Sequence, residues 1–176
     1  VALTTNGSGN ATVVNDAALN LAASTVGGAL SATATTGNMS DSGNVTVAGT
    51  SSFTTSANNA TITLDNTNAL TGAVTITTND DSGTDADVTI DNGTTALILA
   101  ASTIDGDLSL TSGHASGITD NGTLTVGGNL AAITDANNGV ITLDQLAVDG
   151  TVALTTNGSG NATVVNDAAL NLAAST

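Results

Sequence analysis

Aspartate supplies the main candidates for binding chemistry in this 176-residue chain. All 15 acidic residues are Asp, and Lys and Arg are absent. Carboxylate oxygens are the ligands that Ca²⁺ prefers, and carboxylates stacked in a column without protein cations repel one another unless ions neutralise them. One hypothesis is therefore a weak Ca²⁺ column. Its candidate ligands fall near the ends of six successive strand-like segments: Asp41, Asp65, Asp91, Asp120, Asp144 and Asp167.

The densest acidic cluster lies in NDDSGTDAD at residues 79–87, which has the composition of a loop. We interpret it as a solvated or ion-binding loop and as a second candidate Ca²⁺ site. The alternative for both groups is that each Asp accepts hydrogen bonds from backbone N–H groups of its own turn, which requires no metal. We favour this alternative, so no cofactor is required. The loop carboxylates are Asp80, Asp81, Asp85 and Asp87.

Catalytic constellations are missing from the sequence. A solenoid lyase uses a basic residue to move a proton, and this chain has no Lys or Arg for that role. A serine nucleophile needs a base and an orienting acid, but the single histidine, His114, lies in the turn-like SGHASG and no G-x-S-x-G elbow occurs. We therefore expect no enzyme activity and no catalytic residue.

Internal repeats in the sequence indicate how the candidate residues are arranged in the fold. Residues 1–25 recur without change as residues 152–176, which sets a period of 151 residues. An older duplication lies inside that period, because LNLAASTVGGAL from Leu19 resembles LILAASTIDGDL from Leu97. The two half-repeats are residues 19–96 and 97–169. We expect the whole chain, 1–176, to be one continuous repeat domain.

Each half-repeat divides again into three segments, each of a length that suits one coil of a three-sided parallel β-helix. Alternating apolar residues such as Val45 and Val47 indicate strands with one buried face, and Asn-Gly pairs indicate corners. The sequence thus predicts an all-β solenoid with about six coils per period. The segments are 19–42, 43–68, 69–96, 97–121, 122–145 and 146–169.

The amino-acid composition argues against several classes of binding partner. A net charge of −15 without any Lys or Arg argues against binding to nucleic acid or anionic lipid. No run of about 18 apolar residues is present, so we expect no membrane insertion. Proline is absent and the one aromatic residue is Phe53, which suits a thin, regular β core better than a globular one.

Several segments resemble the shaft repeats of large haemagglutinin-like bacterial adhesins of the two-partner secretion and autotransporter types: LNLAASTVGGAL, DSGNVTVAG, ITLDN and ALTGAVTI. The resemblance implies right-handed β-helical rods that are secreted and displayed on the bacterial cell surface. It implies the structural shaft of a giant repetitive protein, either an adhesin stalk or an extracellular filament. Expected partners are copies of itself, joined head to tail or laterally into fibres, and a cell-surface or glycan receptor outside this segment.

Two alternatives remain open. The half-repeats also have a length that suits a tandem array of immunoglobulin-like spacer domains, although such sandwiches usually bury more large side chains than this chain has. An ice-binding solenoid is the second alternative, because Thr63, Thr89 and Thr142 each lie between two apolar residues and could form an outward ladder on one face.

Overall fold

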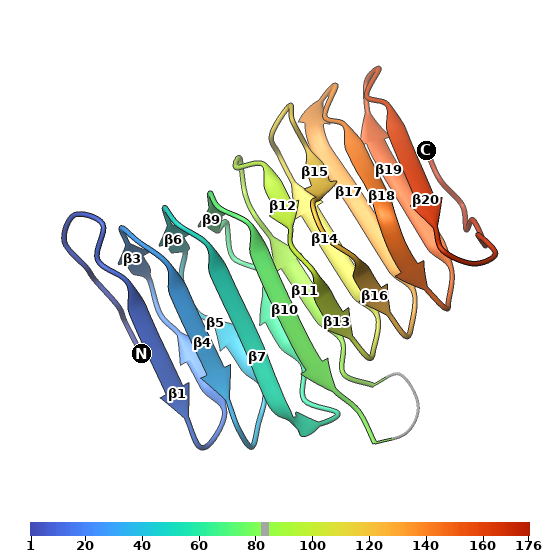
Figure 1. Ribbon diagram of the computed structural model, residues 1–176. Helices are drawn as coiled ribbons and strands as arrows, with labels where there is room; N and C mark the ends of the chain where they lie inside the picture. Colours follow the sequence, from blue (N-terminus) through green and yellow to red (C-terminus); the bar gives the residue numbers. More distant parts are fainter. Residues whose placement is uncertain (82–84) are drawn as a thin grey trace.

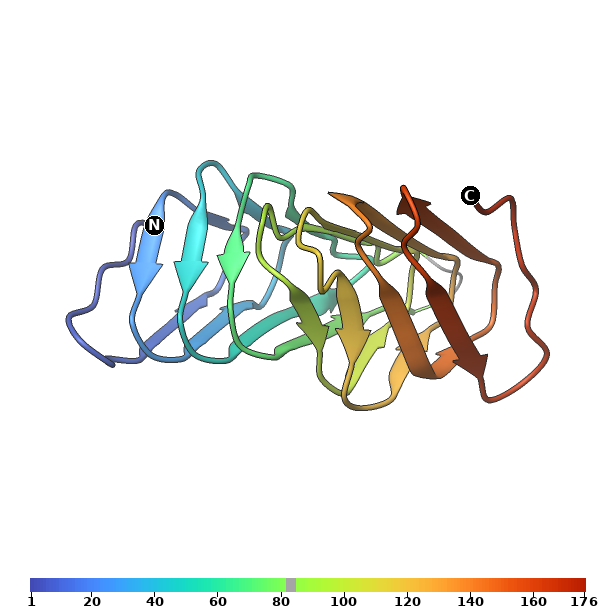
Figure 2. The same cartoon turned by 90° about the horizontal axis from the view of Figure 1, so that it is seen from above.

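The chain winds into a right-handed β-solenoid, in which strands of successive coils pair in parallel. The computed structural model describes residues 1–81 and 85–176. Figure 1 shows the strands side by side along the rod, from the N-terminal end in blue to the C-terminal end in red. Figure 2 shows the same coils from above. The predicted all-β, right-handed parallel β-helix is confirmed.

The strands of the described residues form three sheets. The ten-stranded sheet contains β1 (Ala11–Asn15), β4 (Leu30–Ala34), β7 (Ser51–Asn58), β10 (Val74–Asn79), β12 (Leu97–Leu99), β13 (Ser102–Ile104), β15 (Ile118–Asp120), β16 (Leu124–Val126), β18 (Ile141–Val148) and β20 (Ala162–Asn166). The seven-stranded sheet contains β2 (Leu19–Leu21), β5 (Met39–Asp41), β8 (Ile62–Leu64), β11 (Val88–Asp91), β14 (Leu108–Ser112), β17 (Leu130–Asn137) and β19 (Val152–Asn157). The three-stranded sheet contains β3 (Ser24–Val26), β6 (Val45–Val47) and β9 (Ala69–Leu70).

Most coils combine one straight strand with one kinked pair of short strands. In the kinked pair β2 and β3, buried Leu21 is followed by two residues before buried Ser24, so the two-residue alternation breaks and the chain bends. In the straight strand β4 the alternation runs unbroken from Leu30 to Ala34. We call a straight strand, or a kinked pair, one half-coil.

Each half-repeat holds an odd number of half-coils. Three kinked pairs alternate with three straight strands from β2 to β10, and then a second straight strand, β11, follows β10 directly. Because of this extra half-coil, the next half-repeat begins on the opposite side of the rod, half a turn further around its axis. The kinked pair that starts at β2 lies in the seven-stranded and three-stranded sheets, whereas its equivalent, β12 with β13, lies in the ten-stranded sheet.

The coil count corrects the prediction of six coils per period. Coils differ in length: the coil that leads from Ala11 to its partner Leu30 is shorter than the coil that leads from Ile62 to its partner Val88. The sequence predicts one coil for segment 69–96, yet this segment holds β9, β10 and the extra strand β11. Because each half-repeat contains seven half-coils, one period contains about seven coils.

Register shows how one period joins the next. The column that starts at Leu19 passes through seven successive pairings, by way of Val88 and Val152, and ends at Leu172. Leu172 is the repeat copy of Leu21, so the column has moved forward by two positions within the repeat after seven coils. A two-residue shift keeps inward side chains inward, because side chains alternate with a period of two. The repeat therefore continues its own core.

Ser51 is a polar residue at a core position of β7, between Leu30 and Val74 of the adjacent strands. It is 2% exposed, and its hydroxyl has no hydrogen-bond partner among the described residues. A buried polar group without a partner costs about 1–3 kcal/mol. We expect Ser51→Ala to raise the free energy of unfolding by about 1 kcal/mol in urea denaturation.

Ser112→Ala is the matched control for Ser51→Ala. Ser112 is equally buried, but its hydroxyl donates to the carbonyl oxygen of Thr95 at 2.9 Å. Its removal should lower the free energy of unfolding by about 1 kcal/mol, because a made hydrogen bond is lost. Equal losses of stability in both variants would contradict the account of Ser51.

Candidate binding face

The six aspartates expected in one column fall at two corners on different sides of the rod. Asp41 and Asp91 end strands of the seven-stranded sheet, and Asp65 follows β8 of that sheet. The ten-stranded sheet carries the other three: Asp120 ends β15, Asp144 lies in β18 and Asp167 follows β20. The half-turn between half-repeats causes the division, because it moves equivalent positions to different sheets.

Carboxylates of both corners accept hydrogen bonds from the next coil or from their own turn. Asp41 accepts from the side-chain amide of Asn66 at 2.8 Å and from that of Asn68 at 2.7 Å. Asp120 accepts from the backbone N–H groups of Asp144 at 3.1 Å and Gln145 at 3.0 Å. Within its own turn, the carboxylate of Asp91 accepts from the backbone N–H of Gly93. These contacts favour the capping interpretation.

The loop aspartates also serve as acceptors where the structure describes them. Asp80 accepts from the N–H of Asp81, and Asp87 accepts from the N–H of Asp107 in the following coil at 2.8 Å. Asp81 and Asp85 are exposed. Residues 82–84, inside the predicted ion-binding loop, lie outside the described residues. Within the described part, no three acidic or histidine side chains gather closely enough to hold one metal ion.

Chelation tests the two interpretations of the aspartates. We expect an excess of EDTA to leave the thermal midpoint unchanged, because Asp41 and Asp120 receive their hydrogen bonds from the protein itself. The measurement is thermal unfolding by circular dichroism, with and without EDTA or added Ca²⁺. A midpoint that falls with EDTA and recovers with Ca²⁺ would show structural calcium and contradict the capping interpretation.

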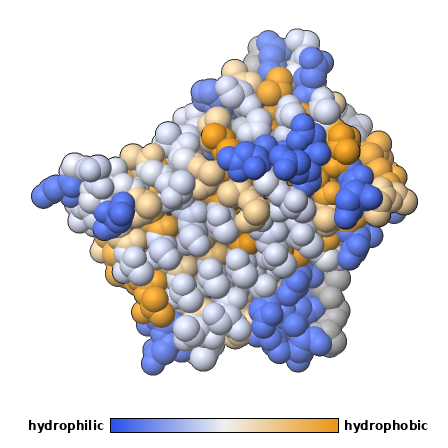
Figure 3. All heavy atoms as spheres, in the orientation of Figure 1, coloured by the Kyte–Doolittle hydropathy of each residue, from blue (hydrophilic) through white to orange (hydrophobic). Residues whose placement is uncertain are grey.

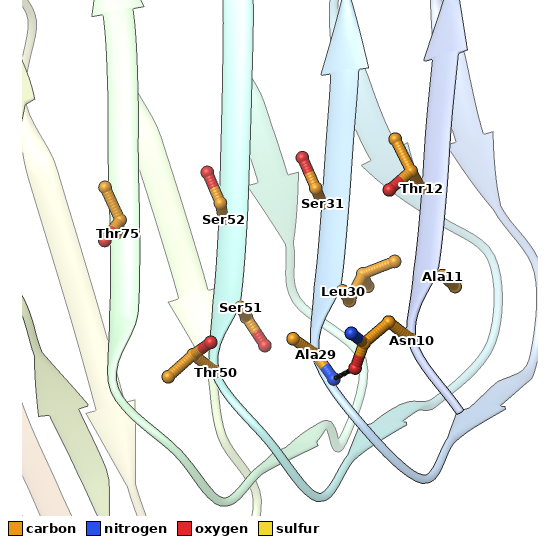
Figure 4. A pocket seen from close by; sticks show the side chains of 10 residues that line it. All are labelled: Asn10, Ala11, Thr12, Ala29, Leu30, Ser31, Thr50, Ser51, Ser52 and Thr75. Carbon is orange, nitrogen blue, oxygen red and sulfur yellow. Dashed lines mark hydrogen bonds between the residues drawn. The ribbon is translucent and has the colours of Figure 1, made fainter. Parts of the chain in front are cut away.

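The outer surface of the first straight strands forms a flat face of hydroxyl side chains. Its first column runs through Thr12, Ser31, Ser52 and Thr75, which are partners in the registers of β1, β4, β7 and β10. The second column, two residues further along each strand, is Val14, Thr33, Thr54 and Thr77. We call these eight residues the hydroxyl face. Figure 4 shows the first column projecting from neighbouring strands.

A shallow groove of about 260 Å³ lies at the start of these strands, beside the hydroxyl face. Its lining includes Asn10, Thr50 and Ser51 together with the first column of the hydroxyl face. The amide oxygen of Asn10 accepts the backbone N–H of Ala29 in the next coil. No carboxylate lines this groove. Its polar groups are therefore neutral hydrogen-bonding groups.

A second groove of about 240 Å³ occupies the equivalent place in the other half-repeat, on the seven-stranded sheet. Its edge carries a polar ladder in which Asp107 accepts from the N–H of Asn129, and Asn129 accepts from the N–H of Thr151. Two carboxylates, those of Asp87 and Asp107, line it. The face beside it, called the second face, is more apolar: Thr89, Asp91, Ser109, Thr111, Ala131, Ile133, Ala153 and Thr155.

The threonine ladder expected from Thr63, Thr89 and Thr142 does not lie on one sheet. Thr63 pairs with Thr89 in the seven-stranded sheet, whereas Thr142 pairs with Thr119 in the ten-stranded sheet. The sequence missed the hydroxyl face because the strands that build it are not equally spaced. Each step along its first column, from Thr12 to Thr75, is longer than the one before, so no fixed period reveals its members.

Comparisons with known proteins identify the repeats and assign them no activity. A family model described as repeats of unknown function (DUF5649) matches residues 8–77 and again residues 85–157. Each match spans close to the length of one half-repeat. No curated protein and no solved structure matches the chain. The described residues contain no helix that is long and apolar enough to cross a membrane.

Proposed function

The chain belongs to the family of DUF5649 repeats of unknown function, and we propose that it is a structural shaft segment of a giant secreted repetitive protein. The shaft would form an adhesin stalk or an extracellular filament on a bacterial surface, as in the haemagglutinin-like adhesins that the repeats resemble. A solenoid suits this role, because each coil contacts only its neighbours and the rod lengthens with every repeat. Binding to a cell-surface or glycan receptor would then reside outside the segment.

The observation that carries the proposal is the contrast between two identical stretches of sequence. Leu21 is fully buried and Leu19 is 4% exposed, because the next coil covers them. Their repeat copies at the C-terminal end, Leu172 and Leu170, are 56% and 39% exposed. Full burial of a leucine contributes about 1.5–3 kcal/mol. Burial of these leucines therefore depends on stacking of the following coil, as expected for a shaft built from stacked coils.

Immunogold electron microscopy of intact cells tests the role and the location together. We expect antibodies against this segment to label thin fibres outside the cell. Trypsin should leave the labelled segment intact because it has no Lys or Arg. Label confined to the cell interior, or a compact particle in place of a fibre, would refute the proposal.

The exposed coils at the two ends favour head-to-tail association of separate copies. The two ends do not match directly, however, because they differ in position by one half-coil. At the N-terminal end, Thr4 lies beneath β3, and β1 is the edge of the ten-stranded sheet. At the C-terminal end, Leu172 already covers β19, while β20 is an edge. A second copy cannot place its residues 1–6 on β19 until residues 168–176 are removed.

Deletion of residues 168–176 should therefore promote end-to-end stacking. In the shortened chain, residues 1–6 of one copy can cover β19 of another while β1 pairs with β20, as parallel strands do in the coils of one chain. Sedimentation velocity should show larger, concentration-dependent species than the complete 176-residue chain does. A shortened chain that remains monomeric while the complete chain assembles would contradict this account of the ends.

A further inference from the structure

We propose that the hydroxyl face is an ice-binding surface. Seven of its eight side chains are Ser or Thr hydroxyls, and the eighth is Val14. Figure 3 shows the face over β1, β4, β7 and β10 as a mostly pale area of weakly polar residues, with hydrophilic residues at its lower corners and hydrophobic ones along its left edge. A face of this composition presents methyl groups and hydroxyls together, which can order water without holding it as tightly as charges do.

The hydroxyl face is regular in two directions. Neighbouring strands lie about 4.8 Å apart, and outward residues on one strand repeat at about 6.6 Å, so the hydroxyls form a two-dimensional lattice. Each member of the first column is held by the parallel register that links Thr12 to Ser31, Ser52 and Thr75. Both spacings are of the order of the distances between regularly repeated oxygen atoms in hexagonal ice. The surface of an ice crystal, which has its own lattice, can therefore contact several of these hydroxyls at once.

Charge is excluded from this face although the chain carries a net charge of −15. None of the aspartates belongs to the hydroxyl face or lines its groove. The second groove is lined by Asp87 and Asp107, so the same molecule carries a charged counterpart. Carboxylates impose their own hydration shell, which does not fit an ice lattice. The hydroxyl face and not the second face is therefore the candidate.

Ser51 lies behind the hydroxyl face, at an inward position between Leu30 and Val74 of the adjacent strands. It lines the groove beside the hydroxyl face, is 2% exposed, and its hydroxyl has no partner among the described residues. Buried hydroxyls normally have a partner. The Ser51 hydroxyl is itself buried, so it faces the core and does not contact water in the groove. A glycan is a weaker fit, because sugar rings usually stack on aromatic side chains and the one aromatic residue, Phe53, is buried.

The test measures thermal hysteresis, the gap between the melting and freezing temperatures of an ice crystal, for the 176-residue chain. We expect measurable hysteresis and faceted ice crystals. Ser52→Tyr places a bulky ring in the centre of the hydroxyl face and should abolish most of the effect. Ala131→Tyr, at the equivalent outward position of the second face, is the matched control and should leave it unchanged. Circular dichroism verifies that both variants fold.

Two further variants sharpen the result. Val14→Thr completes the second column and should increase hysteresis, whereas Ser51→Ala should leave it unchanged because the Ser51 hydroxyl faces the core. The absence of hysteresis in the unmodified chain would overturn the proposal, as would equal losses in Ser52→Tyr and Ala131→Tyr. Binding to an insoluble polysaccharide without any hysteresis would overturn it too and would assign the face to a glycan instead. None of these outcomes affects the proposed shaft.

Discussion

Phe53→Ala should destabilise the solenoid by about 3–5 kcal/mol, the range for truncating a fully buried aromatic side chain. Phe53 is fully buried at the middle of β7, and its ring occupies the core between Ala32 and Ile76 of the adjacent coils. Ala32 beneath it is small, so removal of the ring leaves a cavity that neighbouring side chains cannot fill without moving the backbone. Urea denaturation followed by circular dichroism measures the loss.

Phe53→Leu is the control, because a hydrophobic replacement of similar size usually costs less than about 1.5 kcal/mol. The residue equivalent to Phe53 in the other half-repeat is Ala132, which lies between Leu110 and Leu154 of the adjacent coils. Large and small core residues are therefore arranged differently in the two half-repeats. Because solenoid stability is a sum over neighbouring coils, Phe53→Ala should weaken the first half-repeat selectively. A loss below about 1 kcal/mol would show that the core relaxes around the cavity.

Gly72→Ala should destabilise the chain by several kcal/mol, on the scale of overpacking in a rigid core. Gly72 belongs to a ladder of glycines at the corner before the straight strands, where Gly49 and Gly28 lie in the coils below and each N–H donates to the carbonyl oxygen beneath. A Cβ on Gly72 would lie 2.5 Å from the carbonyl oxygen of Gly49 and 2.8 Å from the backbone nitrogen of Thr50. Backbone atoms cannot move aside as a flexible side chain does.

Gly9→Ala is the matched control at the first rung of the same ladder. Its Cβ would come no closer than 3.2 Å to any neighbouring atom, because no coil of the chain lies beneath it. We expect Gly9→Ala to change the thermal midpoint little and Gly72→Ala to lower it strongly. Similar midpoints for the two variants would show that the corner can open to admit a methyl group.

The strands could be predicted from the sequence because their alternation is local. Val45 and Val47 alternate with outward residues, and both are buried in β6 as expected. The repeat of residues 1–25 predicted a solenoid, and it is one. The coil count could not be predicted, because nothing within VTID of β11 indicates that this strand joins the seven-stranded sheet directly after β10.

The candidate sites were less predictable than the strands, because they depend on which residues stack. Asp41 and Asp120 occupy equivalent places in the two half-repeats, but the half-turn puts them on different sheets. Ser31 and Ser52 are neighbours only through the pairing of β4 with β7, whose offset along the chain differs from the offsets of the pairings on either side. Spacing along the sequence therefore indicated a column of aspartates and concealed the hydroxyl face.

Cryo-electron microscopy of a polypeptide with several consecutive copies of the full repeat period tests the central claim most directly. Seven coils per period at about 4.8 Å each predict a continuous rod that lengthens by about 34 Å per period, with equivalent residues shifted by two positions around its axis. A rod that lengthens by about 29 Å per period, as six coils would give, would contradict the seven-coil architecture. So would a chain of separate globular beads.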